Sequence, residues 1–378
     1  MPEIFLPAIL IFLILHYAAF LSVILRGLKK LDCANTYNTH DEYISIIIPF
    51  RNESANILEC LKSITAIDYP DDRFEVIYVN NSSDDNSLEL LNNACKLENV
   101  SVISVPANFS ENAHKKRAIR FGIENSKGSI IFTTDADCVH QPAWLKTMMN
   151  CFDENTGFVS GPVEFCEEQS FWADIQKTEF AGLVLTGAGL IGSNSPIICN
   201  AANIAYRKSA YDAVNGFKDN MNLSSGDDEF LMQKIWKDTS YKVKFCLSKE
   251  AIVKTEVNKT VEQFYSQRKR WASKGLFYAD KFLVIKLILI FLYYLSLLVI
   301  PLLAVFISVK YLLILLLSIV VKICFEYRIL SLGAKLLFSK DILRNFIWAE
   351  LLQVPYIVIA GLSGIFGNFT WKERKVKR

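Results

Sequence analysis

The sequence has no C-x-x-C pair, and its nine cysteines are odd in number and spaced unlike any metal-binding pattern. Disulfide frameworks and structural zinc sites both depend on paired or closely spaced cysteines, so we expect reduced thiols instead. The chain also lacks a sizeable net charge, because 41 Lys and Arg oppose 39 Asp and Glu. Its composition therefore gives no reason to expect a nucleic-acid partner. No internal repeat or low-complexity segment is present either.

Charge is also absent from a long N-terminal segment, residues 4–25. At about 1.5 Å per residue, a helix of this length crosses a hydrocarbon core of about 30 Å. Arg26, Lys29 and Lys30 follow the run, whereas a cleaved signal peptide carries its positive charges before it. We therefore predict an uncleaved transmembrane anchor over residues 1–25. Because Lys and Arg are in excess on the cytoplasmic side of membrane segments, the chain after the anchor is predicted to be cytoplasmic.

Uncharged runs return in the C-terminal part of the chain, at residues 287–309 and 351–371. A shorter apolar run between them is interrupted by three charged residues, namely Lys322, Glu326 and Arg328. We predict a C-terminal transmembrane region over residues 282–371 with two or three spans. Three spans would place the basic tail, residues 372–378, outside the cell unless the last run is re-entrant or interfacial. The sequence leaves both topologies open.

Between the membrane segments, strand patterns alternate with helix patterns. Predicted strands cover residues 44–48, 74–79, 100–105 and 129–134. The helix after the first strand has Ile57, Leu58, Leu61 and Ile64 on one face, and the next helix has Leu88, Leu91 and Ala94. Such alternation predicts a largely parallel, three-layer α/β sheet with polar loops at one edge. The predicted order is a linker over 26–42, this domain over 43–255 and a basic segment over 256–281.

The strand at residues 129–134 ends on two carboxylates, Asp135 and Asp137. Ligands bind at the carboxyl ends of parallel strands, and two acids at this position suit a hard divalent cation that grips a diphosphate. A turn cap before Pro142 is the structural alternative. His140 lies nearby, but a single loop histidine is more often only solvated than a metal ligand.

Three further polar segments follow along the chain. Asn200 and Asn203 flank small residues, which suits either a loop that hydrogen-bonds hydroxyl groups or an ordinary turn. The adjacent acids of Gly226-Asp227-Asp228 stand at a predicted helix start, where N-capping explains one of them. Residues 267–271 form a basic segment beside aromatic residues. This segment fits either a helix on a membrane surface or side chains that point inward at phosphate.

Together these segments resemble the membrane-bound glycosyltransferases of family 2, which include cellulose, hyaluronan and chitin synthases and ceramide glucosyltransferases. The resemblance runs from about Ile44 to Trp271. Four motifs carry it in order, namely Pro49-Phe50-Arg51-Asn52-Glu53, Asp135-Ala136-Asp137, Gly226-Asp227-Asp228 and Gln267-Arg268-Lys269-Arg270-Trp271. The resemblance implies a GT-A fold, the Rossmann-like α/β fold of nucleotide-diphospho-sugar transferases, with N-terminal and C-terminal transmembrane helices.

The resemblance implies a donor site for a nucleotide-diphosphate sugar. Glu53 would accept a hydrogen bond from the base, although an acid at a helix N-terminus explains it nearly as well. Asp137 would ligate Mg²⁺ or Mn²⁺ bridging the diphosphate, beside Asp135, while Gln267 and Arg270 would bind the diphosphate directly. The implied nucleotide-sugar-binding residues are Pro49, Asn52, Glu53, Asn81, Lys115, Asp135, Gln267 and Arg270.

The resemblance also implies an acceptor site and a mechanism. Asp228 would be the general base that removes the proton of an acceptor hydroxyl in a single displacement with inversion. Trp271 would wall the acceptor channel, since an aromatic face suits a sugar ring. The implied acceptor-binding residues are Asn200, Asn203, Asp227 and Trp271. The family usually carries paired Asp where this chain has Asn80 and Asn81, so a uridine donor is expected on weaker grounds.

The expected function is transfer of a sugar to a lipid or lipid-linked glycan in cell-envelope synthesis by an integral protein of the cytoplasmic (inner) membrane. A processive polysaccharide synthase is the first alternative. A nucleotide-sensing membrane transporter or scaffold is the second, because Lys310, Lys322 and Glu326 can be interpreted as charges on an ion path. A nucleotidyltransferase shares the scaffold but not the Gln267 to Trp271 motif. The sequence identifies neither the sugar, nor the acceptor, nor the oligomeric state.

Overall fold

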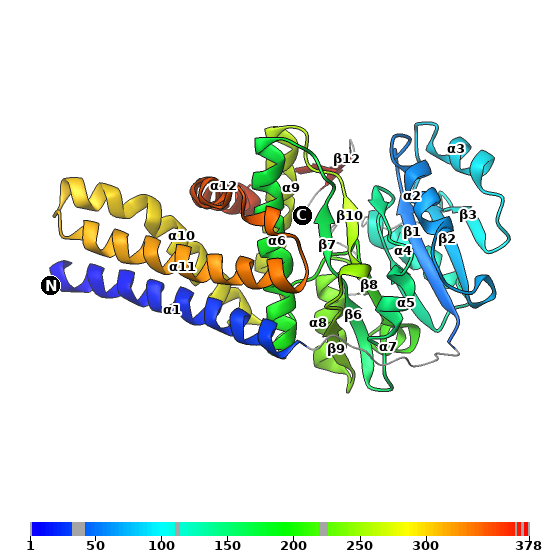
Figure 1. Cartoon of the computed structure of the whole chain (residues 1–378), viewed down its shortest axis with the longest axis horizontal. Coiled ribbons are helices and arrows are strands. Elements are labelled where there is room, and N and C mark those ends of the chain that lie inside the picture. Colours follow the sequence, from blue (N-terminus) through cyan, green and yellow to red (C-terminus); the bar gives the residue numbers. More distant parts are fainter. Residues whose placement is uncertain are drawn as a thin grey trace.

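The computed structural model of the chain describes residues 2–31, 42–109, 114–218, 226–366, 369–371 and 374–376. Figure 1 shows a bundle of long helices, a sheet domain, and two helices that run crosswise between them. The eight cysteines in the described part of the chain are all free thiols, as predicted. Cys33 and most of the predicted linker lie outside the described residues.

The main sheet has seven strands in the order β3-β2-β1-β4-β8-β6-β9. β8 runs antiparallel to both of its neighbours, and every other neighbouring pair is parallel. The strands are β1 (Ile44–Phe50), β2 (Phe74–Asn80), β3 (Val100–Ser104), β4 (Ile130–Thr133), β6 (Thr156–Ser160), β8 (Ile204–Arg207) and β9 (Lys242–Phe245). The prediction of a largely parallel α/β sheet is therefore confirmed. Because β1, β2 and β4 are parallel neighbours, the loops that follow them meet at one edge.

A second sheet begins directly after the Asp135–Asp137 turn. It has three strands in the order β5-β10-β7. These are β5 (Cys138–Val139), β7 (Val163–Phe165) and β10 (Val253–Thr255). Strand β5 follows the turn after β4 directly and pairs with β10. The turn therefore connects the main sheet to the small sheet.

Short helices cover the main sheet. They are α2 (Ile57–Thr65), α3 (Ser87–Ala94), α4 (His114–Glu124), α5 (Trp144–Met149), α7 (Lys208–Ala213) and α8 (Glu229–Asp238), with short 3-10 turns at Asp71–Arg73 and Lys249–Ala251. Ile57, Leu61 and Ile64 of α2 are buried as predicted, but Leu58 is 42% exposed. Leu58 lies about 100° around the helix from Ile57, which turns it away from the sheet. Ala94 of α3 is likewise exposed.

The helical bundle consists of α1 (Pro2–Lys30), α10 (Lys281–Phe306) and α11 (Tyr311–Leu336), which lie side by side in Figure 1. Helix α1 continues five residues past the predicted end of the anchor at residue 25, because Leu28 is buried and the helix packs on α6 (Phe171–Gly192). By length and composition, the segments Phe5–Lys30, Lys281–Phe306 and Phe346–Gly364 can each cross a membrane. Helix α11 is as long as α10, but its charged residues Lys322, Glu326 and Arg328 lie in the interior of the helix, whereas Lys281 and Lys286 of α10 lie near its start.

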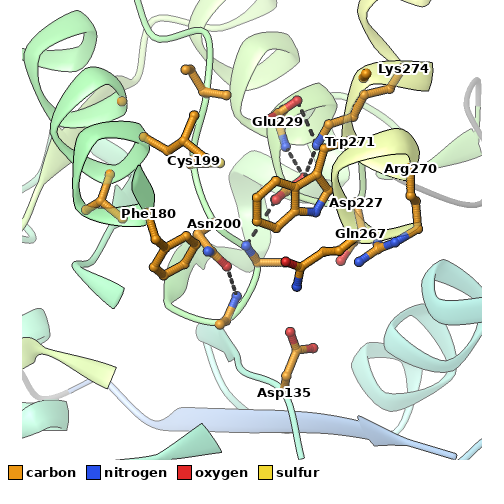
Figure 2. Close-up of a pocket in the computed structure, with 18 of the residues that line it drawn as sticks. Asp135, Phe180, Cys199, Asn200, Asp227, Glu229, Gln267, Arg270, Trp271 and Lys274 are labelled. Carbon is orange, nitrogen blue, oxygen red and sulfur yellow. Dashed lines mark hydrogen bonds and ion pairs between the residues drawn. The ribbon is translucent and has the colours of Figure 1, made fainter. Parts of the chain in front are cut away.

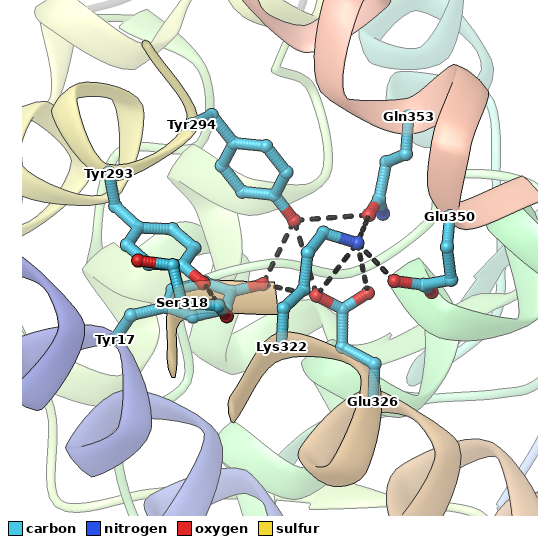
Figure 3. A network of polar contacts seen from close by, with 8 residues as sticks. All are labelled: Tyr17, Tyr293, Tyr294, Ser318, Lys322, Glu326, Glu350 and Gln353. Atoms are coloured by element: carbon cyan, nitrogen blue, oxygen red, sulfur yellow. Dashed lines mark hydrogen bonds and ion pairs between the residues drawn. The ribbon is translucent and has the colours of Figure 1, made fainter. Parts of the chain in front are cut away.

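Two charged residues of α11, Lys322 and Glu326, are paired inside the helical bundle (Figure 3). Lys322 contacts the carboxylates of Glu326 and Glu350, and its Nζ lies 2.6 Å from Gln353 Oε1. Tyr17 donates to Glu326 at 2.6 Å and lies 2.9 Å from the Tyr294 hydroxyl. We call these residues the bundle network, which comprises Tyr17, Tyr293, Tyr294, Ser318, Lys322, Glu326, Glu350 and Gln353. It joins α1, α10, α11 and α12 (Phe346–Phe366).

Helices α6 (Phe171–Gly192) and α9 (Val261–Ser273) run crosswise between the bundle and the sheet domain (Figure 1). Helix α1 meets α6 so closely that a Cβ atom at Gly27 would lie 1.7 Å from the Gly189 carbonyl oxygen. Any side chain at Gly27 would push the two helices apart. Short 3-10 turns at Gly275–Phe277 and Lys340–Leu343 connect the later helices.

Helix α12 (Phe346–Phe366) is seen nearly end-on in Figure 1, so it crosses the direction of the bundle. It packs against α9, α10 and α6. A two-stranded hairpin follows, formed by β11 (Phe369–Trp371) and β12 (Arg374–Val376), and β11 contacts α9. The described part of the basic tail therefore lies on the side of the sheet domain.

Candidate functional site

A single cavity of about 570 Å³ extends from the loop edge of the main sheet to helices α6, α10 and α12. Its polar end is lined by the loops after β1, β2 and β4 and by the start of α8. Its apolar end is lined by α6, α10 and α12. Figure 2 shows Asp135 pointing from the sheet edge toward Gln267 and Arg270 of α9. The cavity thus connects a charged sheet edge with an apolar wall.

The loops after β1 and β2 supply Pro49, Glu53 and Asn81 to the cavity wall. Glu53 Oε2 accepts a hydrogen bond from Asn56 Nδ2 at 3.1 Å, which leaves the carboxylate at the cavity. Asn81 is buried, and its Oδ1 accepts from Arg117 at 2.7 Å. The resemblance implies that these three residues contact the nucleotide, and all three line the cavity.

Asn52 does not line the cavity. Its backbone adopts a φ of 54°, in the left-handed region, and its side-chain oxygen accepts from the Asp84 backbone N–H at 2.9 Å. Asn tolerates this conformation better than most residues because its side chain can bond to nearby backbone. This geometry gives Asn52 a role in shaping the loop after β1 and does not support the implied direct contact with the nucleotide.

The turn after β4 brings Asp135 and Asp137 into the cavity. Lys115 of α4 lies between the two acid motifs, because its Nζ is 2.6 Å from Asp135 Oδ1 and 3.4 Å from Asp227 Oδ2. Burial would lower the pKa of Lys115, but Asp135 and Asp227 raise it further than burial lowers it. Lys115 therefore remains protonated and holds Asp135, while Asp137 lines the cavity beside it.

The residues fit a divalent metal only if the ligand supplies part of the coordination. Among the described residues, no group of three or more His, Cys, Asp and Glu side chains could hold a metal ion. Asp137 and Asp135 provide hard oxygen donors at the cavity, which suit Mg²⁺ or Mn²⁺. Mg²⁺ in particular is usually held by one or two carboxylates together with substrate phosphates.

His140 is not solvated, contrary to the prediction. It is buried, and its two ring nitrogens lie 2.9 Å from Thr134 Oγ1 and 3.2 Å from Ser63 Oγ. Burial lowers the pKa of His140 to about 3, so the ring is neutral. Both nitrogens are already hydrogen-bonded, which excludes His140 as a metal ligand in this arrangement.

The second acid motif stands at the start of α8. Asp228 caps the helix, since its Oδ1 accepts from the Glu229 backbone N–H at 2.8 Å, and its Oδ2 accepts from the Ala201 backbone N–H at 3.0 Å. N-capping therefore does explain one acid, as expected. Asp228 also lines the cavity, so the same carboxylate that caps the helix is available to a ligand.

Asp227 is buried beside two lysines. Its Oδ2 has the ion pair with Lys115 but no hydrogen bond. Burial would raise the pKa of Asp227, but the positive charges of Lys115 and Lys116 lower it overall. Burial lowers the pKa of Lys116 to about 8 in turn. Asp227 is thus an ionised carboxylate with an unused hydrogen-bonding oxygen at the cavity.

Sequence reasoning did not predict the role of Glu229 and Lys274. Lys274 Nζ lies 3.0 Å from Glu229 Oε2 and 3.9 Å from Asp228 Oδ1, and the Tyr278 hydroxyl donates to Glu229 at 2.6 Å. Burial raises the pKa of Glu229 to about 7, although Lys274 opposes this shift. The only sequence signal was a third acid directly after Asp227-Asp228.

Helix α9 presents its motif to the cavity rather than to a membrane surface. Gln267, Arg270 and Trp271 all line the cavity, and Trp271 stacks on Phe180 with ring centres 6.2 Å apart. Burial lowers the pKa of Arg270, although four nearby aspartates oppose this. The Arg270 side chain has no hydrogen bond or ion pair with any described residue. A guanidinium without a partner in a cavity is suited to bind an anionic group.

Arg268 of the same motif is a structural residue that sequence reasoning missed. It is 4% exposed and forms an ion pair with Glu179 of α6. Its guanidinium also lies between the rings of Phe264 and Trp271, 4.3 and 4.5 Å from their centres. Arg268 therefore fixes α9 on α6 and orients the Trp271 ring toward the cavity.

The two asparagines predicted to bind the acceptor differ. Asn200 lines the cavity, and its Oδ1 accepts from the Ala202 backbone N–H at 3.0 Å. Asn203 is fully buried outside the cavity. Its Oδ1 accepts from Trp144 Nε1 at 2.9 Å, and its Nδ2 donates to the Pro162 and Ala251 carbonyl oxygens at 2.8 Å each. The predicted acceptor contact of Asn203 is therefore wrong, because its amide ties three loops together.

Two family models match the chain. "Glycosyl transferase family 2" matches residues 45–214, and "Glycosyl transferase family group 2" matches residues 130–353, more than half of the chain. The chain belongs to the family 2 glycosyltransferases. The resemblance inferred from the four motifs is thereby confirmed, and the protein is an enzyme rather than a transporter or a scaffold.

Among the curated relatives of this glycosyltransferase is glycosyltransferase AglE of Haloferax volcanii, 27% identical over 188 residues, or 49% of this chain and 59% of that protein. Poly-beta-1,6-N-acetyl-D-glucosamine synthase of Staphylococcus epidermidis is 24% identical over 242 residues, or 62% and 55%. Undecaprenyl-phosphate 4-deoxy-4-formamido-L-arabinose transferase of Aeromonas hydrophila is 34% identical over 106 residues, or 28% and 32%. The chain thus spans less than two thirds of each of these relatives.

Among solved structures, the mannosyltransferase PcManGT from Pyrobaculum calidifontis, in complex with GDP-Man and Mn²⁺, resembles this chain. The TM-score is 0.58 at 18% sequence identity, and the match covers 95% of this chain and 98% of that one. At this identity the likeness bears on the fold alone, and it supports the GT-A architecture.

Proposed function

We propose that this glycosyltransferase moves a sugar from a nucleotide-diphosphate sugar to a lipid or lipid-linked glycan, with inversion at the anomeric carbon. One observation carries the proposal. A single cavity holds two acid motifs and Arg270, which has no partner among the described residues, at one end and an apolar wall of α6, α10 and α12 at the other. An anionic donor suits the first end, and a lipid acceptor suits the second.

The polar end is assigned to the donor. Arg270 and Gln267 bind the diphosphate, because a guanidinium fork matches phosphate oxygens. Glu53 and Asn81 face the base, and the carboxylate and amide offer hydrogen bonds to uracil. We therefore expect UDP-sugars first, although PcManGT was captured with GDP-Man. Asp137, with Asp135 beside it, would hold Mg²⁺ or Mn²⁺, which when bound neutralises charge on the diphosphate.

Asp228 is assigned as the general base. Two backbone N–H groups and Lys274 hold its carboxylate at the cavity wall. As the acceptor oxygen bonds to the anomeric carbon, Asp228 takes the hydroxyl proton. The bond between that carbon and the diphosphate oxygen breaks, and its electron pair stays on the nucleoside diphosphate. Arg270 stabilises the charge that grows there, and this preorganised contribution exceeds that of the base.

We propose that α1, α10 and α11 span the membrane and that α12 lies along its interface. Three positive charges, Arg26, Lys29 and Lys30, follow the hydrophobic run of α1 and precede the sheet domain. This favours a protein of the inner membrane whose sheet domain lies in the cytoplasm. The crosswise direction of α12 and the contact of β11 with α9 keep the described part of the basic tail on the same side. The interfacial alternative then agrees with the positive-inside tendency.

The test is release of nucleoside diphosphate by the detergent-purified full chain, across a panel of UDP- and GDP-sugars with Mg²⁺ or Mn²⁺. A native membrane lipid extract supplies the acceptor. We expect metal-dependent release of nucleoside diphosphate with one donor, and the extract should increase it. In the Asp228→Asn variant, transfer of the sugar to the acceptor should be abolished. Equal release by wild type and Asp228→Asn would contradict the base assignment. If the protein neither binds nor turns over any nucleotide sugar, the proposed function is contradicted.

A further inference from the structure

We infer that the acceptor presents an uncharged hydroxyl group to Asp228, on a lipid whose apolar part lies between α6, α10 and α12. This inference rests on the proposed sugar transfer and narrows its acceptor. A membrane glycosyltransferase can act on a lipid phosphate or on a lipid alcohol, and the two demand different surroundings. A phosphate needs cations that are not already neutralised, whereas an alcohol needs a base.

The charges of the cavity are unfavourable for a second anion. The described residues that line it include six acidic and four basic side chains. Arg51 pairs with Asp84, Lys115 pairs with Asp135 and Asp227, and Lys274 pairs with Glu229. Of the four basic side chains, Arg270 alone has no partner among the residues described. Once the donor diphosphate occupies Arg270, no unpaired cation in the described wall is left for an acceptor phosphate.

The three acids at the start of α8 make this stronger. Asp227, Asp228 and Glu229 are consecutive and buried, and the lysines beside them, Lys115, Lys116 and Lys274, already interact with these carboxylates. A lipid phosphate beside them would add like charge in a low-dielectric site. A hydroxyl adds no charge, and it can donate its hydrogen to a carboxylate oxygen.

The need for proton removal during attack also favours a hydroxyl acceptor. The second pKa of a phosphate monoester is about 6, so at neutral pH its oxygen attacks without a base. A lipid hydroxyl must lose its proton during attack, and Asp228 is a carboxylate fixed at the cavity by two backbone N–H groups. The new bond joins the hydroxyl oxygen to the anomeric carbon, the proton passes to Asp228, and the diphosphate leaves with the electron pair.

The apolar end of the cavity opens toward the lipid-facing side of the helices. Leu183 of α6 and Ile288 of α10 both line the cavity, yet they are 38% and 42% exposed. Large exposed apolar side chains in a cavity wall mark a lateral opening through which an acyl or alkyl chain can enter. Tyr294 lies at the other limit of this wall, where the bundle network holds its hydroxyl (Figure 3).

The experiment compares acceptors on the full chain in nanodiscs, with the donor identified by nucleoside diphosphate release. Dioleoylglycerol and monoglucosyl dioleoylglycerol are the hydroxyl probes, and undecaprenyl phosphate is the phosphate probe. We expect a hydroxyl probe to accelerate release about tenfold or more over water alone and to yield a glycosylated lipid by mass spectrometry. Acceleration by undecaprenyl phosphate alone would overturn the inference, while donor turnover would still support the proposed function.

The groove is tested with Ile288→Trp on α10 and Leu183→Trp on α6, which add bulk at two exposed positions of its wall. Leu298→Trp is the matched control, because Leu298 is also on α10 and 41% exposed but does not line the cavity. We expect the first two variants to raise the KM for the lipid about tenfold with a smaller change in kcat, and the control to leave both unchanged. An unchanged KM in both groove variants, with thermal unfolding like wild type, would place the lipid elsewhere and overturn the assignment.

Discussion

The molecule contains two clusters of buried charge that differ in the completeness of their contacts. In the bundle network, Lys322 contacts two carboxylates and the Gln353 amide oxygen. In the cavity, Arg270 has no partner among the described residues, and Asp227 Oδ2 has an ion pair but no hydrogen bond. Charges with complete contacts fix the positions of helices, whereas charges with incomplete contacts retain the capacity to bind a ligand. The difference assigns a structural role to the first cluster and a chemical role to the second.

The largest effect is expected for Asp228→Asn. Asn caps a helix as well as Asp does, so the variant should fold normally. Without the carboxylate the acceptor proton has no base, and kcat for transfer should fall by about 10²–10⁴-fold. Steady-state transfer and thermal unfolding measured on the same preparation check both expectations.

The matched control for this prediction is Asp238→Asn. It makes the same chemical change at the other end of α8, where Asp238 is exposed and outside the cavity. Its transfer rate should equal that of wild type. Equal losses in the two variants would mean that the charge of α8, rather than the position of Asp228, matters.

If the bundle network has a structural role, Lys322→Met should cause a large loss of stability. The change leaves Glu326 and Glu350 buried near each other without their counter-charge. Removing one partner of a buried ion pair costs about 3–5 kcal/mol. Thermal unfolding in detergent should show this loss, and adding Glu350→Gln should recover part of it. A variant as stable as wild type would mean that the bundle network does not stabilise the fold.

Much of the fold and several site residues were accessible from the sequence. The strands ending at Phe50, Asn80 and Thr133 are apolar and β-branched, so their positions and the shared loop edge followed from periodicity and from the geometry of parallel sheets. Asp135 and Asp137 had to lie at that edge because they directly follow a strand. The Gln267 to Trp271 motif was found by resemblance, since its composition fitted a membrane surface equally well.

Other features depend on distant contacts that no local pattern contains. Asn203 looked like a ligand-binding loop residue, but its amide bonds to residues 41 to 59 positions away, which sequence spacing does not reveal. His140 is buried against helix α5 and Ser63, and its contact with Ser63 likewise joins residues far apart in the sequence. The charges of α11 looked like interruptions of a span because their partners, such as Glu350, come from another helix.

A smaller effect is expected from the pH dependence of Glu229, whose pKa burial raises to about 7 from an ordinary value of 4.5. Folding therefore favours the protonated carboxyl, and this contribution is complete below about pH 4.5 and lost as the pH rises through about 7. Relative to Glu229→Gln, wild type should lose about 1–3 kcal/mol of unfolding free energy across that window. Unfolding midpoints between pH 4.5 and 8 measure this, and parallel curves for the two proteins would contradict it. Lys274, Asp228 and Tyr278 are unchanged in both proteins.

The most direct measurement compares UDP and GDP binding by wild type, Arg270→Ala and Lys322→Met, using calorimetry at a temperature where all three are folded. If unpaired charge marks the ligand site, Arg270→Ala should weaken nucleotide binding by about 10- to 100-fold, because it removes charge-assisted hydrogen bonds to the diphosphate. Arg270→Lys should lie between, since it keeps the charge but not the fork. Lys322→Met should bind as wild type does. Full affinity in Arg270→Ala together with a loss in Lys322→Met would contradict the account.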